Sequence, residues 1–305
     1  LERAEHTARL VDVTLDLMPD RSGEANRRAW ERIFSGLRLP VPDLEQLDAF
    51  ELTRTLTLDS SNQGSIIADI TAARENARQV RELISPEMWE QLNRLFLRVS
   101  RTNIKKIWRD QPHDFFQGVK EGTHLFQGIS DSTMNHGEGW YFIQVGQFLE
   151  RAGNVAALFS GYLPDDPGQG KSTHASNQYL DWVSLLRSCT AFEAYCKVYT
   201  AETRFEEIAE FLLLNPEFPH SVHCAINTVR AALNAIAEAT DSAKHNVANR
   251  RVGRLKAMLD YDQIDEILAS DMGAYLDNIQ QQCAQIHNSI YNTYINYPAS
   301  QKLVG

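Results

Sequence analysis

Glutamate and arginine stand side by side at two similar places in the chain, and both residue types can do chemistry. Glu2 precedes Arg3, and Glu150 precedes Arg151, each time within the sequence Leu-Glu-Arg-Ala. A guanidinium group can grip a carboxylate or phosphate with parallel hydrogen bonds, and a carboxylate can serve as a general acid or base. Adjacent residues of a helix point about 100° apart, so each of these side chains needs a partner elsewhere.

A second helix supplies candidate partners. Within the predicted helix 64–84, the residues Arg74, Arg78 and Arg81 each follow an apolar residue of the core-facing stripe. They therefore form a basic row beside that stripe. In the corresponding part of the second half of the chain only Arg230 remains, so the two halves are chemically unequal.

We expect two ion pairs at the centre of the fold, one between Glu2 and Arg74 and the other between Glu150 and Arg230. Asn76 adds a polar group that the second half lacks. The predicted polar centre comprises Glu2, Arg3, Arg74, Asn76, Arg78, Glu150, Arg151 and Arg230. Three roles remain open: ion pairs that fix helix register, a site for a carboxylate or phosphate, or a partner interface. No catalytic residue is assigned.

Metal and cofactor sites are not predicted in this chain. Glu121 and His124 have the Glu-x-x-His spacing of di-iron bundles, but such a site needs a second copy of the motif and two further glutamates. Gly-rich phosphate loops and Gly-x-Ser-x-Gly segments are absent from the sequence. The cysteines have no metal-binding spacing, and we expect reduced core residues at Cys189, Cys196, Cys224 and Cys283.

The elements that position these residues are predicted to be helices. Apolar residues recur at helical spacing in nearly every segment between turn residues, and strand signals are almost absent. We therefore predict an all-α fold, a helical bundle, in which 103–131, 176–200 and 263–296 are each one long helix. The segment from Pro164 to Ser172 is the best candidate for a flexible loop.

The bundle is predicted to consist of two divergent tandem repeats, 1–135 and 136–305, packed as one domain. The two Leu-Glu-Arg-Ala segments are 148 residues apart, and a longer helix aligns at an offset of 156. Its apolar stripe of Ile66, Ile70, Ala73, Ala77, Val80 and Ile84 corresponds to Val222, Ile226, Val229, Leu233, Ile236 and Thr240. Such stripes pack against neighbouring antiparallel helices.

Charge and hydropathy exclude several classes of protein. Thirty Lys and Arg stand against forty Asp and Glu, and a net charge of -10 weighs against a general binder of nucleic acid or anionic membrane. The sequence holds neither an apolar stretch long enough to span a membrane nor a signal peptide, so we expect a cytoplasmic protein. The first residues already follow a helical pattern, and we expect the first helix to be truncated.

Three segments together resemble the bacterial alpha-E family, a helical domain named for its Glu-Arg motif. They are the Leu-Glu-Arg-Ala pair, the stretch Ala73–Ser85 and the stretch Gly146–Ala152, and the resemblance spans essentially the whole chain. The Tyr-Trp-Met-Gly-Arg-Tyr type of lead-in usual in the family is absent here. Gln147 replaces a usual Arg, and Gly153 and Asn154 also depart from the pattern. These departures weigh against full function of the second half.

The resemblance implies a function beside another protein. Such proteins are typically encoded next to, or fused to, circularly permuted ATP-grasp ligases and transglutaminase-like proteins. That implies an accessory role in ATP-dependent amide or peptide bond formation, with ATP and Mg bound by the partner ligase and not by this chain. Two alternatives stand beside it: an enzyme in its own right with a central Glu and an Arg anion clamp, or a structural interaction module. A homo-oligomer is compatible with each.

Overall fold

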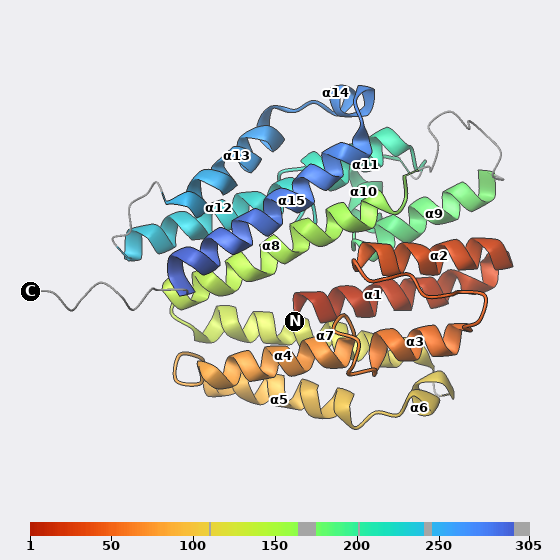
Figure 1. Ribbon diagram of the computed structural model, residues 1–305, viewed down its shortest axis with the longest axis horizontal. Coiled ribbons are helices and arrows are strands. Elements are labelled where there is room, and N and C mark those ends of the chain that lie inside the picture. The colour runs from red at the N-terminus through yellow and green to blue at the C-terminus, as the bar shows by residue number, and fades with distance from the viewer. Residues whose placement is uncertain (110, 164–174, 201, 241–245, 296–305) are drawn as a thin grey trace, which may run out of the picture. The chain divides into compact units, whose positions relative to one another are not determined.

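The computed structural model describes residues 1–109, 111–163, 175–200, 202–240 and 246–295. Over these residues the chain is all-helical and contains no strand, which confirms the predicted fold class (Figure 1). None of the helices described is long and apolar enough to cross a membrane. The predicted loop Pro164–Ser172 lies outside the described residues.

The chain divides into two compact units. Unit 1 consists of Leu1–His136 and Ala157–Ile208, and unit 2 consists of Gly137–Ala156 and Ala209–Gly305. Because Ala157–Ile208 belongs to unit 1, the two units do not coincide with the predicted repeats 1–135 and 136–305. The tandem repeat itself remains a prediction.

Unit 1 is organised around helix α1, which spans Glu2–Leu17. The other helices of this unit are η1 (Met18–Asp20), α2 (Gly23–Gly36), α3 (Ala49–Thr57), α4 (Ile66–Gln79), α5 (Pro86–Ser100), α6 (Ile104–Arg109), α7 (Pro112–Thr133), α9 (Ala175–Ser188) and α10 (Phe192–Val198). Helices α2, α3, α4, α7 and α9 pack against α1. Ala4 and Ala8 of α1 are fully buried. Their small side chains allow the neighbouring helices to pack closely against α1 from several sides.

Close packing also fixes the position of α7 against α5. A Cβ atom at Gly122 would lie 2.8 Å from Cδ1 of Leu95, and the side chain of Gln91 donates to the Gly122 carbonyl at 2.9 Å. Gly118, one turn earlier, leaves room for the guanidinium of Arg98. The two glycines therefore let α5 approach one side of α7 closely.

Unit 2 contains most of α8 (Glu138–Ser160) and of α11 (Phe205–Leu214), together with α12 (Val222–Ala239), α13 (Val247–Tyr261), α14 (Ile264–Ala269), α15 (Met272–Ile290) and the π-helical turn η2 (Tyr291–Ile295). Helix α12 packs against α13, and α13 packs against α15. The predicted stripe of α12 is fully buried from Val222 to Ile236. Ser221 caps the helix by accepting a hydrogen bond from the Cys224 amide.

Two predicted helices of the first half are shorter than expected. The span 103–131 is split into α6 and α7, because Pro112 begins a new helix and Gln111 before it has a φ of 79°. The span 64–84 ends at Gln79, so Val80 is exposed instead of continuing the core stripe.

Two predicted helices of the second half are also split. The span 176–200 breaks into α9 and α10 around Thr190, whose φ is 56°. The span 263–296 breaks into α14 and α15 because the side chain of Asp271 caps α15, accepting from the Ala274 amide.

Candidate functional site

Helix α1 carries charged side chains into the interior of unit 1. Residues Glu5, Arg9 and Asp12 are between 3% and 6% exposed, although each carries a charge-bearing group. Burying a charge is unfavourable unless the charge is paired and hydrogen-bonded. Glu5 and Arg9 lie one turn apart and form an ion pair on the helix.

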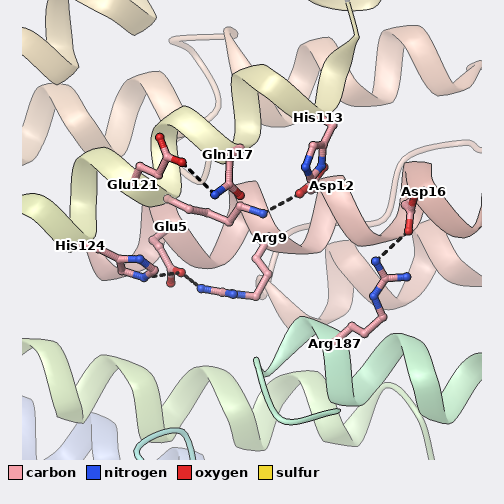
Figure 2. A network of polar contacts seen from close by, with 10 residues as sticks. Glu5, Arg9, Asp12, Asp16, His113, Gln117, Glu121, His124 and Arg187 are labelled. Carbon is pink, nitrogen blue, oxygen red and sulfur yellow. Dashed lines mark hydrogen bonds and ion pairs between the residues drawn. The ribbon is translucent and has the colours of Figure 1, made fainter. Parts of the chain in front are cut away.

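Helix α7 provides the remaining partners (Figure 2). Lys120 donates to Asp12 with an Nζ to Oδ2 distance of 2.6 Å, and Nδ1 of His113 lies 2.9 Å from Oδ1 of the same carboxylate. Nε2 of His124 lies 3.4 Å from Oε1 of Glu5. We call this set the α1–α7 cluster: Glu5, Arg9, Asp12, His113, Lys120 and His124.

The two helices present matching rows of polar residues. Gaps of 4, 3 and 4 residues separate the members of each row: Glu5, Arg9, Asp12 and Asp16 on α1, and His113, Gln117, Lys120 and His124 on α7. Such gaps keep side chains on one face of a helix. The early residue Glu5 pairs with the late residue His124, so the helices run antiparallel along the cluster.

The pair of His113 and Asp12 has the geometry of an oriented base. The imidazole side chain is 66% exposed, whereas the carboxylate that holds it is 8% exposed. With a proton on Nδ1 donated to Asp12, Nε2 is left as an acceptor, and it has no partner among the described residues. A carboxylate that fixes the tautomer and direction of a histidine in this way supports proton transfer at the other ring nitrogen.

A cysteine beside the cluster does not add a nucleophile. Burial raises the pKa of Cys189 to about 12, although the positive charge of Arg9 acts in the opposite direction. The thiol therefore stays protonated near neutral pH. All four cysteines are free thiols. Cys189 and Cys283 are buried as expected, but the prediction of a core position is wrong for Cys196 and Cys224, which are only partly buried.

The residues predicted for the polar centre of the first half lie along α1 and α4. Glu2 is buried, whereas Arg3 is exposed and lies 3.8 Å from Asp69 of α4. Asn76 is exposed, and Arg78 is an exposed residue that donates to Glu75. Only Glu2 of these four points into the interior.

Arg74 has partners other than the one predicted. Its Nε donates to Oδ1 of Asn93 at 2.7 Å, its Nη1 lies 3.4 Å from Glu75, and its guanidinium lies 4.8 Å from the centre of the Phe96 ring. The expected ion pair with Glu2 is therefore wrong, because α5 supplies an amide and an aromatic face that already hold the guanidinium.

The predicted residues of the second half lie in unit 2. Arg151 is buried, donates to the Pro219 carbonyl at 3.3 Å and lies over the ring of Phe148. Glu150 is half-buried. Arg230 is exposed and forms no ion pair with a described residue, so the expected pair of Glu150 with Arg230 is wrong as well.

The α1–α7 cluster was missed by the sequence prediction. The adjacent Glu-Arg pairs do not mark Glu5, Arg9 and Asp12, which recur along one face of α1. The signal that could have found them is the matched spacing of the two rows, in two helices that both contain apolar residues. Burial of those charges, however, depends on α4, α7 and α9 covering α1, and that is a tertiary feature.

No group of three His, Cys, Asp or Glu within the described residues is arranged to hold a metal ion. The Glu-x-x-His motif serves a different structural purpose. Glu121 accepts a hydrogen bond from Gln117 at 3.0 Å, whereas His124 faces Glu5. The two residues of the motif therefore have separate partners.

Comparison with known proteins places the chain in one family. The Alpha-E family model, described as a predicted alpha-helical domain with a conserved ER motif, matches residues 1–295. No curated protein and no solved structure gives a significant match. The match covers the Glu-Arg pairs at both Glu2 and Glu150.

Proposed function

The chain belongs to the Alpha-E family, and from this premise we propose that it is an accessory helical protein or domain of an ATP-grasp-type amide ligase. In this proposal the ligase, in the same polypeptide or in another chain of the bacterial cytoplasm, binds ATP and Mg and forms the amide bond. The Alpha-E chain contributes binding of the ligase or of its substrate. The predicted polar residues beside the core provide the contacts.

A charged strip along α4 is the observation that supports this proposal. We define the α4 strip as Arg3, Asp69, Arg74, Glu75, Arg78 and Arg81. Four arginines against two acidic residues leave a local charge of +2, whereas the whole chain carries -10. The side chains of Arg3 and Arg78 are more than half exposed, so their charges are within reach of a partner.

Contacts from α5 hold the strip in place. The guanidinium groups of Arg74 and Arg81 each lie 5.6 Å from the centre of the Trp89 ring, and Glu75 holds Arg78 at 2.8 Å. Because these side chains are already ordered, a partner loses less entropy in binding them. The strip is thus suited to an acidic surface of a ligase or to an anionic substrate group.

The test is to purify the ligase encoded beside this chain and to measure its ATP consumption with and without the chain. We expect the chain to raise the rate and to bind the ligase directly. Replacing Arg78→Glu together with Arg81→Glu should weaken binding by roughly tenfold or more, because like charges would then face the partner. Arg250→Glu together with Arg254→Glu, an equal charge change at two exposed sites on α13, is the matched control and should leave binding unchanged.

Two outcomes would reject this proposal. One is that the chain neither binds the ligase nor changes ATP consumption. The other is that the α4 variant and the control with Arg250→Glu and Arg254→Glu weaken binding equally, which would show a response to net charge alone.

The second candidate function is that of an enzyme in its own right, and the pair of His113 and Asp12 favours it. The sequence pointed to a central Glu for this role, but Glu2 is buried, whereas His113 is exposed and held by a buried carboxylate. We propose His113 as the general base in this alternative. Its test is turnover of the ligase product by the chain alone. His113→Gln should abolish turnover and keep the fold, and turnover that survives this change would remove the candidate.

A further inference from the structure

A second charged cluster lies elsewhere in unit 1, and its charges do not balance. We define the Arg21–Arg32 cluster as Arg21, Arg32, Tyr162, Asp181 and Ser184. Arg21 lies in the turn before α2, and Arg32 lies within α2. Tyr162 follows α8, and the other two residues belong to α9.

Arg32 is held from several directions. Its Nη1 lies 2.7 Å from Oδ1 of Asp181, and its Nε donates to the Gly161 carbonyl at 3.1 Å. The guanidinium lies 4.5 Å from the centre of the Tyr162 ring, whose hydroxyl donates to Oγ of Ser184 at 3.1 Å. The carboxylate of Asp181 is therefore mainly the partner of Arg32.

Arg21 is buried without equivalent partners. Its side chain is 1% exposed, and only Nη2 has contacts, at 3.5 Å to Asp181 and 3.4 Å to the Leu180 carbonyl. Both distances are at the outer limit of a hydrogen bond. Nε and Nη1 are buried and have no hydrogen-bond partner in the described part of the chain.

The cluster therefore has an excess of one positive charge. Two guanidinium groups share the single carboxylate of Asp181. Burial lowers the pKa of Arg21, and the neighbouring charge of Arg32 acts in the same direction, although Asp181 opposes both. A buried charge of this kind with unused donors is stabilised by an anion that accepts from them.

We propose that the Arg21–Arg32 cluster is a binding site for the carboxylate group of a small monoanionic ligand. One negative charge cancels the excess, whereas a phosphate dianion would leave a new buried charge. The occupant is small because Arg21 and Tyr162 are buried, so the surface of another protein does not reach them. Asp181 and Arg32 are partly exposed and mark the side from which the ligand enters.

Tyr162 and Trp182 give the site an aromatic wall. Their ring centroids are 6.4 Å apart, and both residues are buried. A carboxylate attached to an apolar or aromatic group would contact this wall while its oxygens accept from the guanidinium groups. Benzoate is therefore a better probe than acetate. This site does not depend on the proposed ligase partnership, because its test uses the chain alone.

The experiment is isothermal titration of the full chain at pH 7 and constant ionic strength with sodium benzoate, acetate, phosphate and chloride. We expect saturable binding of one benzoate per chain, weaker binding of acetate, and no saturable binding of phosphate or chloride. Arg21→Met, which keeps most of the apolar stem, should weaken benzoate binding by roughly tenfold or more. Arg27→Met, at an exposed arginine of the same helix region, should have no effect.

The wild-type titration tests for the carboxylate site even if Arg21→Met fails to fold. Absence of saturable benzoate binding would overturn the proposal. Equal binding by Arg21→Met would overturn the assignment to this cluster. Tighter binding of phosphate than of benzoate would contradict a carboxylate site. Arg21→Lys, which keeps the charge, should retain part of the affinity.

Discussion

Each unit contains an aspartate that is held by one lysine and one histidine, and the two trios differ in what is buried. In unit 1, Asp12 is the buried member, and His113 is exposed. In unit 2, the buried member is His223, with a side-chain exposure of 11%, whereas Asp260 is 28% exposed. The same three residue types are therefore used in opposite orientations.

The orientation decides what each trio can do. In unit 2, Nδ1 of His223 lies 2.9 Å from the Leu214 carbonyl, and Nε2 lies 2.8 Å from Asp260, so both ring nitrogens are occupied. That histidine joins the end of α11 to α13 and has no nitrogen left for a ligand. In unit 1 the carboxylate is enclosed, and the imidazole keeps one nitrogen for other chemistry. The comparison assigns a structural role to one trio and a candidate functional role to the other.

The largest expected difference between the trios is in stability. Asp12→Ala should lower the free energy of unfolding by about 4 kcal/mol, because it leaves Lys120, whose side chain is 13% exposed, without its carboxylate. Asp260→Ala should cost only about 1 to 2 kcal/mol, since its ion pair with Lys256 is near the surface, although Nε2 of the buried His223 loses its partner. Urea unfolding followed by far-UV circular dichroism measures both. Equal losses would contradict the distinction between the trios.

A double variant separates charge burial from lost packing at the same place. Asp12→Leu combined with Lys120→Met removes both buried charges and keeps apolar volume. It should be more stable than Asp12→Ala, because replacing a buried ion pair with apolar residues is often nearly neutral. If the double variant is as unstable as Asp12→Ala, the loss comes from packing and not from the unpaired lysine.

For the two histidines, the larger loss of stability should fall on the unit 2 trio instead of the unit 1 trio. His223→Ala should lower the free energy of unfolding by about 2 kcal/mol, because it removes two hydrogen bonds of a buried side chain. His113→Ala should cost less than about 1 kcal/mol, since that ring is exposed. Thermal unfolding of the two variants under one buffer condition gives the comparison. A larger loss for His113 would show that its imidazole is structural.

The sequence could predict the helices and their apolar stripes because both depend on local periodicity. The stripe from Val222 to Ile236 is buried as expected. The break before α7 could be predicted from the sequence, since Pro112 disfavours a helical conformation in the residue before it. The break at Thr190 could not be predicted, because a positive φ of 56° at a non-glycine residue depends on tertiary packing.

Charged partners were harder to predict than apolar packing. Asp12 and Lys120 are joined across 108 residues, and no periodicity within either helix gives that pairing. For Arg74, the prediction assumed that a guanidinium beside the core needs a carboxylate. The structure uses Asn93 and Phe96 instead, because an amide oxygen and a ring face can also hold a guanidinium.

The smallest expected effect concerns the response of the unit 2 trio to acid. The pKa of Asp260 lies below its usual value, first because Lys256 donates to the carboxylate and further because His223 also hydrogen-bonds to it. A depressed pKa in the folded state stabilises the fold above the unfolded pKa of about 3.9. That contribution is lost as the pH falls through the lower folded pKa.

Asp260→Asn should therefore cost less than about 1 kcal/mol near pH 5, because the pair is near the surface, and this cost should shrink towards zero at about pH 2. Urea unfolding of the wild-type chain and the variant at closely spaced pH values measures the difference. Asp265→Asn, at an exposed position of α14, is the control and should show no such pH dependence. A difference that grew as the pH fell would mean that the ionised carboxylate of Asp260 destabilises the fold. The unit 2 trio would then lack the favourable pairing that its geometry indicates.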